Sequence, residues 1–282
     1  GEDLASLRDD PRPLRSLKPM SQTSQSPPAI LFDLDGVIYR GSEPIPGAKE
    51  ALERVVDAEW RRLFVTNNST RTREQAAAKI KRVVGHEVDP ADIVTSARAA
   101  MSLIPDSART CLVVGGEGIR EAVAEAGLEI VAGSSGADCV VVGLDRSFDY
   151  EMLHVASTAI REGGSFIATN RDPTFPAADG LMPGAGSLVA ALEAASGVRP
   201  EVAGKPHKAT IDLIRGLGVG EAWVIGDRLD TDIALATEQP DWRSIVVLSG
   251  VTGPEAAGGE ADFVCDDVLA AVDLVLGFEN ER

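Results

Sequence analysis

The chain has 282 residues, 27 basic and 44 acidic side chains, and a formal net charge of −17. Nucleic acid is excluded as the expected partner, because a phosphate backbone is bound by a basic surface. A composition of 44% hydrophobic and 25% charged residues is that of a globular protein with one large or two medium domains, and not of a disordered or collagen-like chain.

The first 28 residues combine charged residues, Ser, Gln and Pro without a helical or strand period. We expect a flexible tail over residues 1–28. No run in the chain approaches the roughly 18 apolar residues of a membrane helix, and the start of the sequence lacks the compact apolar segment of a secretory signal. These features predict a soluble protein of the cytoplasm that does not bind a membrane.

From residue 29 the sequence alternates short aliphatic runs with longer segments of 3.6-residue periodicity. The runs predict buried strands at Ala29–Leu34, Arg62–Val65, Cys111–Val114, Cys139–Gly143, Ser165–Ala168, Trp223–Ile225 and Ile245–Leu248. The periodic segments predict helices at Gly47–Val56, Arg73–Val83, Glu117–Ala126, Tyr150–Glu162, Ser187–Ala195 and Lys208–Leu217. Strands that alternate with helices predict an α/β fold with a parallel sheet.

The predicted strands fall into two groups by the residues that follow them. The runs near residues 30, 64 and 225 lead into Asp, Thr or Asn, whereas those near 113, 141 and 167 lead mostly into Gly or small residues. Open parallel sheets bind ligands at the carboxyl ends of their strands, so the first group predicts a catalytic sheet and the second a separate module. The middle third of the chain is therefore predicted to be an inserted domain.

The three cysteines are far apart in sequence, and Cys111 and Cys139 each begin an aliphatic run. There is no CxxC motif and no secretory signature. We expect all three, including Cys265, to be reduced packing residues rather than members of a disulfide or a metal site.

The first predicted strand leads into the motif Asp33-Leu34-Asp35-Gly36. Side chains alternate along a strand, so Asp33 and Asp35 would point the same way, about 6.6 Å apart along the chain. Their mutual repulsion calls for a cation, and a site of oxygen ligands without His or Cys suits Mg²⁺. Alternatively, the two acids only decorate a loop or cap a helix.

A second acidic cluster follows the strand near 225, where Asp227, Asp230 and Asp232 fall within six residues. Clustered acids at the exit of a buried strand are costly unless a cation binds them. They could also form a solvated turn that caps a helix, because acids are favoured at a helix N-terminus.

Two further segments carry groups that bind phosphate. Thr66, Asn67 and Asn68 supply a hydroxyl and two amides where a strand turns into a helix, which suits phosphate oxygens but is equally ordinary N-cap chemistry. Lys205 lies between Gly204 and Pro206, and is either a fixed charge for phosphate or a solvated surface residue. The acids, the hydroxyl and amides, and the lysine together indicate phosphoryl transfer.

These four segments, in this order, resemble the motifs of the haloacid dehalogenase superfamily of phosphotransferases. The finer spellings resemble its NagD-type subfamily, which includes 4-nitrophenyl phosphatases and glycerol 3-phosphate phosphatases: residues 65–69 (VTNNS), 183–187 (PGAGS), 204–206 (GKP) and 226–233 (GDRLDTDI). The similarity covers residues 29–275. It implies a Rossmann-like, doubly wound parallel-sheet core, residues 29–103 and 200–282, and an inserted α/β cap domain of the C2 type, residues 104–199.

The resemblance also implies a metal site and a two-step reaction. Asp33 would attack phosphorus to give an aspartyl-phosphate, and Asp35 would be general acid to the leaving alcohol and then base to water. The Asp33 carboxylate, the Asp35 carbonyl and Asp227 would bind Mg²⁺, with Asp232 holding a water of the metal. The catalytic set is thus Asp33, Asp35 and Lys205.

For the substrate, the resemblance implies that Thr66, Asn67 and Asn68 grip the transferring phosphoryl group, while Lys205 neutralises its charge. The segment 169–176 resembles the subfamily's substrate loop, in which Arg171 and Phe175 are candidate substrate-binding residues. A His is expected at position 175 in relatives specific for pyridoxal phosphate, so the Phe disfavours that substrate and suits a small polyol or acid phosphate; alternatively, Phe175 only packs within the cap.

These features predict a Mg²⁺-dependent phosphatase of a small phosphorylated metabolite, with glycerol 3-phosphate or 2-phosphoglycolate as first candidates. The resemblance further suggests a homodimer through the cap. Two alternatives stay open at this stage: a phosphotransferase or mutase of the same aspartyl-phosphate chemistry, and a phospho-accepting signalling module. The latter fits less well, because its acceptor Asp would follow a third strand and not the first.

Overall fold

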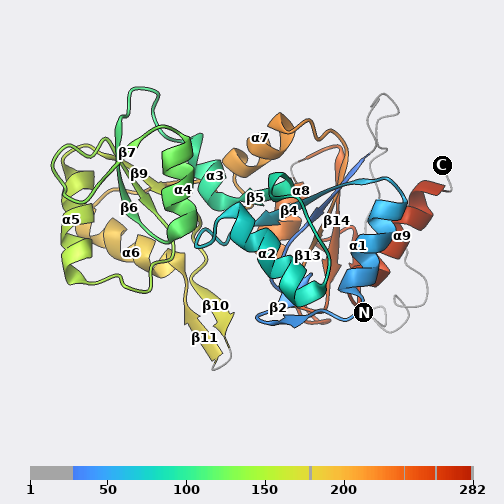
Figure 1. Cartoon of the computed structure of the whole chain (residues 1–282). Coiled ribbons are helices and arrows are strands. Elements are labelled where there is room, and N and C mark those ends of the chain that lie inside the picture. Colours follow the sequence, from blue (N-terminus) through green and yellow to red (C-terminus); the bar gives the residue numbers. More distant parts are fainter. Residues whose placement is uncertain (1–27, 178–179, 238, 258, 281–282) are drawn as a thin grey trace. The chain divides into compact units, whose positions relative to one another are not determined.

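The computed structural model describes residues 28–177, 180–237, 239–257 and 259–280 (Figure 1). The tail predicted for residues 1–28 lies, apart from its last residue, outside this range. The described chain forms two compact units, the first made of residues up to 65, 77–93 and from 214 onward, and the second made of residues 66–76 and 94–213. The segment predicted as a cap, 104–199, falls within the second unit.

A six-stranded sheet forms the centre of the first unit. Its order is β15-β14-β13-β1-β4-β5, with bounds Phe263–Cys265, Trp242–Val247, Ala222–Gly226, Ala29–Phe32, Arg61–Thr66 and Ile93–Thr95. β1 pairs in parallel with both β13 and β4, so the chain winds outward from β1 in one direction and later returns to its other side. This is the doubly wound arrangement, and its switch point lies at β1 and β13.

Burial explains why these strands read as continuous aliphatic runs. Every residue of β1, β13 and β14 is buried, which requires cover on both faces of the sheet. Helices α1, α8 and α9 and the antiparallel pair β2 and β3 also belong to the first unit, with bounds Ala48–Asp57, Ala234–Thr237, Val268–Asn280, Tyr39–Arg40 and Glu43–Pro44. Helices α2 (Arg73–Val84) and α7 (Lys208–Gly216) have residues in both units. Helices α1 and α9 pack against each other and lie side by side in Figure 1.

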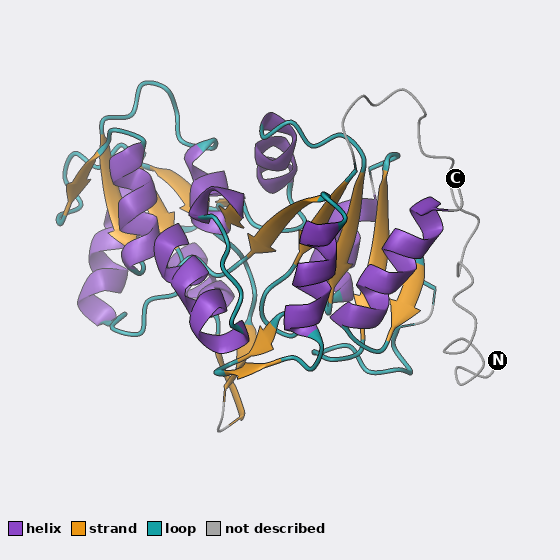
Figure 2. Ribbon diagram, turned by 45° about the vertical axis from the view of Figure 1, so that its right-hand side comes forward, coloured by secondary structure: helices purple, strands orange, loops and turns teal. Residues whose placement is uncertain are grey.

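The second unit contains a five-stranded sheet with parallel pairing throughout. Its order is β12-β9-β8-β6-β7, with bounds Glu201–Val202, Ser165–Ala168, Cys139–Val142, Thr110–Val114 and Glu129–Val131. Four helices, α3, α4, α5 and α6, accompany it, with bounds Ser96–Met101, Glu117–Glu125, Tyr150–Arg161 and Ala185–Ser196. An antiparallel hairpin, β10 (Thr174–Ala177) and β11 (Gly180–Pro183), completes the unit (Figure 2).

Alternate residues of β6 pack into two different cores in this unit. Cys111 and Val113 belong to a cluster with α3 and α4, whereas Leu112 and Val114 belong to a cluster with α5 and α6. The helices therefore cover the sheet on both faces, as expected for buried parallel strands. The predicted α/β fold class is confirmed, and all seven predicted strands and six predicted helices occur within a few residues of their predicted bounds.

The three cysteines are free and buried, as predicted. Burial raises the pKa of Cys265 to about 12, so its thiol stays protonated at neutral pH. Within the described residues, no helix is long and apolar enough to cross a membrane.

Candidate active site

Three carboxylates meet at the carboxyl ends of β1 and β13. Asp33 follows β1 directly, and its backbone N–H donates to the carbonyl of Ile225 at 2.9 Å, which extends the ladder between the two strands. Asp227 follows β13, and Asp232 lies in the π-helical turn Leu229–Ile233 that comes next. One oxygen from each of the three carboxylates lies within 4.8 Å of the others. One acid of the first cluster in the sequence and two of the second thus form one group.

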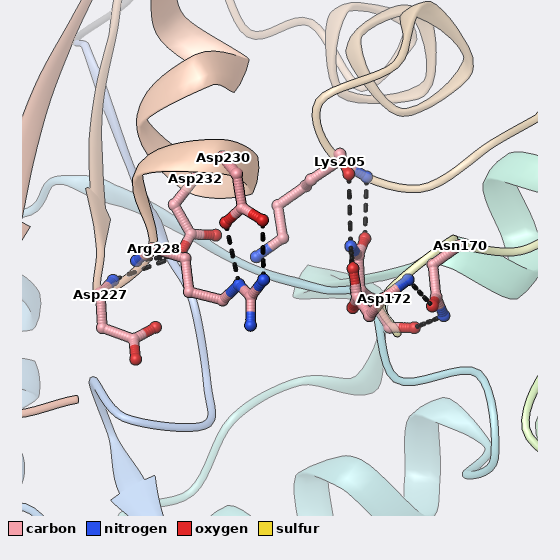
Figure 3. A network of polar contacts seen from close by, with 8 residues as sticks. Asn170, Asp172, Lys205, Asp227, Arg228, Asp230 and Asp232 are labelled. Atoms are coloured by element: carbon pink, nitrogen blue, oxygen red, sulfur yellow. Dashed lines mark hydrogen bonds and ion pairs between the residues drawn. The ribbon is translucent and has the colours of Figure 1, made fainter. Parts of the chain in front are cut away.

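The backbone around this group is built to hold Asp232. Its Oδ2 accepts hydrogen bonds from the backbone N–H of Asp227 at 3.2 Å and of Arg228 at 3.1 Å (Figure 3). A side chain at Gly226 has no room, because its Cβ would lie 2.0 Å from the Cβ of Asp232. The turn therefore folds back on the end of the strand, with Asp232 at its centre.

Two glycines form a cradle for Asp227. A Cβ at Gly250 would lie 1.9 Å from the Oδ2 of Asp227, and one at Gly36, whose φ is +99°, would lie 2.4 Å from it. The same Oδ2 accepts the backbone N–H of Val251 at 2.7 Å. Asp227 and Asp232 are each only 1% exposed, so the interpretation of this cluster as a solvated acidic turn does not describe it.

Burying such a group requires a compensating positive charge. Two carboxylates within 4.8 Å repel each other by at least about 3 kcal/mol at an effective dielectric near 20. The donors are all hard oxygens, and the ligands of a Mg²⁺ ion, at about 2.1 Å from it, lie at most about 4.2 Å apart. A small closure of the three carboxylates therefore fits them to Mg²⁺.

Asp35 lies outside this carboxylate group. Its side chain is 46% exposed, and its Oδ1 lies 3.6 Å from the Nζ of Lys79 on α2. Asp35 also forms a backbone bridge with Tyr39, and the N–H of Gly36 donates to the carbonyl of Tyr39 at 2.7 Å. The loop after β1 is thus a closed turn that presents a half-exposed carboxyl.

The amide of Asn67 is the centre of a network in the second unit. Its Oδ1 accepts the backbone N–H of Lys205 at 2.8 Å, and its Nδ2 donates to the carbonyl of Lys205 at 3.2 Å. The same Nδ2 lies 3.4 Å from the nearer carboxylate oxygen of Asp172. Lys205 is only 5% exposed, so it is not a solvated surface residue. The side chain of Asn67 holds the backbone that carries this lysine.

Thr66 and Asn68 form a local turn at the end of β4. The N–H of Asn68 donates to the Oγ1 of Thr66 at 3.1 Å. The Oδ1 of Asn68 accepts from the N–H of Thr70 at 3.0 Å and from its hydroxyl at 2.7 Å. These are local turn bonds and not a helix cap, because α2 begins at Arg73 and its first turn is bonded by the hydroxyl of Thr72. Binding of phosphate by Thr66 and Asn68 stays a prediction.

Sequence reasoning missed Asn170 and Asp172. The Nδ2 of Asn170 donates to the carbonyl of Asn67 at 2.8 Å, and its Oδ1 accepts the N–H of Asp172 at 3.1 Å. A signal was present, because Thr169 and Asn170 come at the end of β9 much as Thr66 ends β4 and Asn67 follows it. That strand falls in the group that leads mostly into small residues, and within segment 169–176 only Arg171 and Phe175 were singled out as site residues.

The two predicted cap residues have contacts of their own. The guanidinium of Arg171 is exposed and pairs with Glu193 on α6 at 2.7 Å. Phe175 lies on β10 opposite Met182, with the guanidinium of Arg146 5.7 Å from the centre of its ring. A role for either residue in substrate binding stays a prediction.

Comparisons with known proteins agree with this geometry. A family model described as haloacid dehalogenase-like hydrolase matches residues 30–129, and a second, described as HAD-hydrolase-like, matches residues 202–271. An acid sugar phosphatase of Staphylococcus epidermidis is 37% identical over 211 residues, which is 73% of this chain and 80% of that protein. The chain belongs to the haloacid dehalogenase-like hydrolases.

Solved structures place it more closely among these hydrolases. Glycerol phosphate phosphatase from Mycobacterium tuberculosis, in complex with magnesium, is 36% identical, with a TM-score of 0.78 over 86% of this chain and 76% of that one. NagD from Escherichia coli is 28% identical, with a TM-score of 0.77 over 87% of this chain and 98% of that one. The predicted membership among the NagD-type phosphatases is confirmed.

Proposed function

We propose that this protein is a Mg²⁺-dependent phosphomonoesterase that hydrolyses a small phosphorylated polyol through an aspartyl-phosphate on Asp33. The observation that carries the proposal is the group of three carboxylates at the switch point of the sheet, two of them fully buried. Ligand sites of open α/β sheets lie at this point. Asp33, the backbone carbonyl of Asp35 and Asp227 would hold the metal ion, with Asp232 holding a water of the metal. The ion would supply positive charge to the nucleophile and to the phosphoryl oxygens.

In the first step, a carboxylate oxygen of Asp33 attacks phosphorus as the bond to the substrate's leaving oxygen breaks. Asp35 donates its proton to that oxygen, and the alcohol departs. In the second step, Asp35 takes a proton from water, whose oxygen attacks phosphorus and displaces the carboxylate of Asp33. Inorganic phosphate leaves, and both aspartates return to their starting states.

The polar residues at the end of β4 and the buried lysine are the candidates for binding the phosphoryl oxygens. We assign the hydroxyl of Thr66 and the polar groups of Asn67 and Asn68 to those oxygens, and the ammonium of Lys205 to their charge. Support comes from the local geometry, because Asn67 fixes the backbone of a buried lysine. A charge held in place before the reaction stabilises the transition state without a reorganisation cost.

Glycerol 3-phosphate is our first candidate substrate. One similar structure is that of a glycerol phosphate phosphatase, and a curated relative is an acid sugar phosphatase, so both names point to phosphorylated polyols. 2-Phosphoglycolate carries an extra negative charge, which the net charge of −17 disfavours. Arg171 and Phe175 remain the proposed substrate contacts of the cap.

Release of inorganic phosphate from a panel of metabolites, with and without Mg²⁺, tests the proposal. We expect turnover of phosphorylated polyols with Mg²⁺, loss of that turnover with EDTA, and recovery when excess Mg²⁺ is added. Full activity in EDTA would contradict the metal site. Turnover only when a second alcohol is present would favour the phosphotransferase or mutase.

The location and assembly of the protein are further proposals. We retain the cytoplasm as the location and a homodimer through the predicted cap, residues 104–199, as the assembly. Sedimentation of the purified chain tests the dimer, which predicts twice the mass of the 29.6 kDa chain.

A further inference from the structure

A lysine is buried beside the loop that follows β1. The side chain of Lys79 is 10% exposed, although its helix, α2, offers exposed positions such as Lys81, whose side chain is 64% exposed. Removing an ammonium group from water is costly unless it gains partners. We therefore expect the positive charge of Lys79 to interact with specific neighbouring groups.

The ammonium of Lys79 lies between two groups of one loop. Its Nζ is 3.5 Å from the centre of the Tyr39 ring and 3.6 Å from the Oδ1 of Asp35. A cation over an aromatic face is stabilised more strongly when water is excluded, and Tyr39 is itself buried. The backbone of Tyr39 is fixed, because its N–H donates to the carbonyl of Leu34 and its carbonyl accepts the N–H of Gly36. The ring thus holds the ammonium in place next to Asp35.

Asp35 needs such a fixed partner. Its carboxyl is half exposed, and an exposed carboxyl on a loop samples several rotamers. Proton transfer to a leaving group requires the acid within hydrogen-bond reach of the leaving oxygen. The ammonium attracts one oxygen of this carboxyl while the other oxygen carries the proton, so a rigidly held ammonium limits the positions that the carboxyl can take.

We propose that Lys79 is a positioning residue, held by Tyr39, that keeps the carboxyl of Asp35 where it passes its proton to the leaving oxygen. The inference rests on the proposed function, because it takes Asp35 as the general acid. Lys79 acts through Asp35 and does not touch the phosphoryl group. The effect of replacing Lys79 on the reaction rate should therefore depend on the leaving group of the substrate.

A comparison of alkyl and aryl phosphates as substrates distinguishes a residue that positions the general acid from one that affects every step or the fold. The alkoxide that leaves an alkyl phosphate is a strong base and needs the proton, whereas 4-nitrophenolate is a weak base and leaves without it. The ratio kcat/KM reports the steps up to departure of the alcohol, and excludes the later attack of water. Loss of a positioned acid should therefore lower kcat/KM for glycerol 3-phosphate far more than for 4-nitrophenyl phosphate.

The experiment measures kcat/KM for both compounds in Lys79→Met, which keeps the methylene chain and removes the charge. We expect a fall of about 10- to 100-fold with glycerol 3-phosphate and of less than about 3-fold with 4-nitrophenyl phosphate, since general acid catalysis contributes about 10²- to 10⁴-fold. Lys79→Arg should restore most of the loss. Lys81→Met, on the exposed face of the same helix, should change neither value.

Asp35→Asn links the two proposals and tells them apart. Adding Lys79→Met to Asp35→Asn should cause no further loss, because one residue acts through the other. An equal fall with both substrates, or a further loss in the double variant, would overturn the role of Lys79. If Asp35→Asn itself leaves the ratio of the two substrates unchanged, the proposed function of Asp35 fails instead.

Tyr39→Leu gives a second route if Lys79→Met does not fold. It removes the ring that holds the ammonium but leaves the lysine itself in place. We expect the same preference for the aryl substrate, with a smaller loss of about 3- to 10-fold for glycerol 3-phosphate. An unchanged substrate ratio in a folded Tyr39→Leu, checked by circular dichroism, would contradict the inference.

Discussion

The protein contains two parallel sheets of similar construction, and only one of them ends in acids. β1 and β13 of the first sheet lead into Asp33 and Asp227, whereas β6 and β8 of the second lead into Gly115 and Gly143. Gly143 packs closely, because a Cβ there would lie 2.4 Å from the hydroxyl of Ser69. The same fold thus serves chemistry in one unit and packing in the other, and the residues at the strand ends decide which.

The nucleophile gives the strongest test of this difference. Asp33→Asn should reduce phosphate release at least about 10⁴-fold, because the amide cannot form the aspartyl-phosphate. Asp138→Asn is the matched control in the second sheet, where the carboxylate accepts the N–H groups of Arg109 and Thr110. It should leave turnover unchanged. An Asp33→Asn enzyme that retains a tenth of the rate would remove the distinction between the two sheets.

Glycines at the two strand ends should differ in what they control. Gly250→Ala places a Cβ 1.9 Å from the carboxylate of Asp227, so it should raise the Mg²⁺ concentration needed for half-maximal activity by about 10-fold or more. Gly143→Ala should lower the free energy of unfolding by about 1–3 kcal/mol without altering that Mg²⁺ concentration. Titration of activity with Mg²⁺, together with urea unfolding, separates the two effects. The same half-maximal Mg²⁺ concentration in both variants would contradict the proposal that Gly250 and Gly36 keep Asp227 in place for the metal.

The substitution with the smallest expected effect lies at the amino ends of the strands of the first sheet, opposite the carboxylates. Asp241 precedes β14 and receives both terminal nitrogens of Arg215, at 2.6 and 2.8 Å, and this partner lowers the pKa of the Asp241 carboxyl. Asp241→Asn should cost about 1–2 kcal/mol of unfolding free energy at neutral pH and leave turnover unchanged.

The pH dependence of this pair has a defined sign. Because the pKa of Asp241 is lower in the folded chain, the stabilisation is complete above the ordinary aspartate pKa and is lost as the pH falls through the lowered value. Urea unfolding at several pH values checks this. A variant that loses equal stability relative to wild type at neutral pH and below that pKa would contradict it.

Most of the fold could be predicted from local sequence, because buried parallel strands are continuous aliphatic runs. The elements it missed are short or lack a period. β5 and β15 have three residues each, below the length at which a pattern is distinct. The hairpin of β10 and β11 leaves Leu181 and Met182 exposed, so no alternation marks it. The apolar helix α9 was missed although its sequence is strongly hydrophobic, because such a run does not distinguish helix from strand.

The candidate site likewise has a part that could be predicted from the sequence and a part that could not. The carboxylates were predictable, because each acidic cluster directly follows a strand and their chemistry requires a common cation. The contacts of Asn67 with Lys205 and Asp172 join residues that are 138 and 105 positions apart, and no local pattern encodes such pairs. No local pattern encodes the contact between Lys79 and Asp35 either. The two residues are brought together by the fold, Lys79 on the helix α2 that follows β4 and Asp35 in the loop after β1.

The composition of the second unit limits how it can be exchanged between relatives. It takes in residues 66–76 as well as 94–213, and Asn67 in the short segment holds the backbone of Lys205 near the end of the long one. A chimera that transplants only the long segment would separate an amide from the lysine it secures. Recombination of specificity between such enzymes should therefore carry both pieces from one parent.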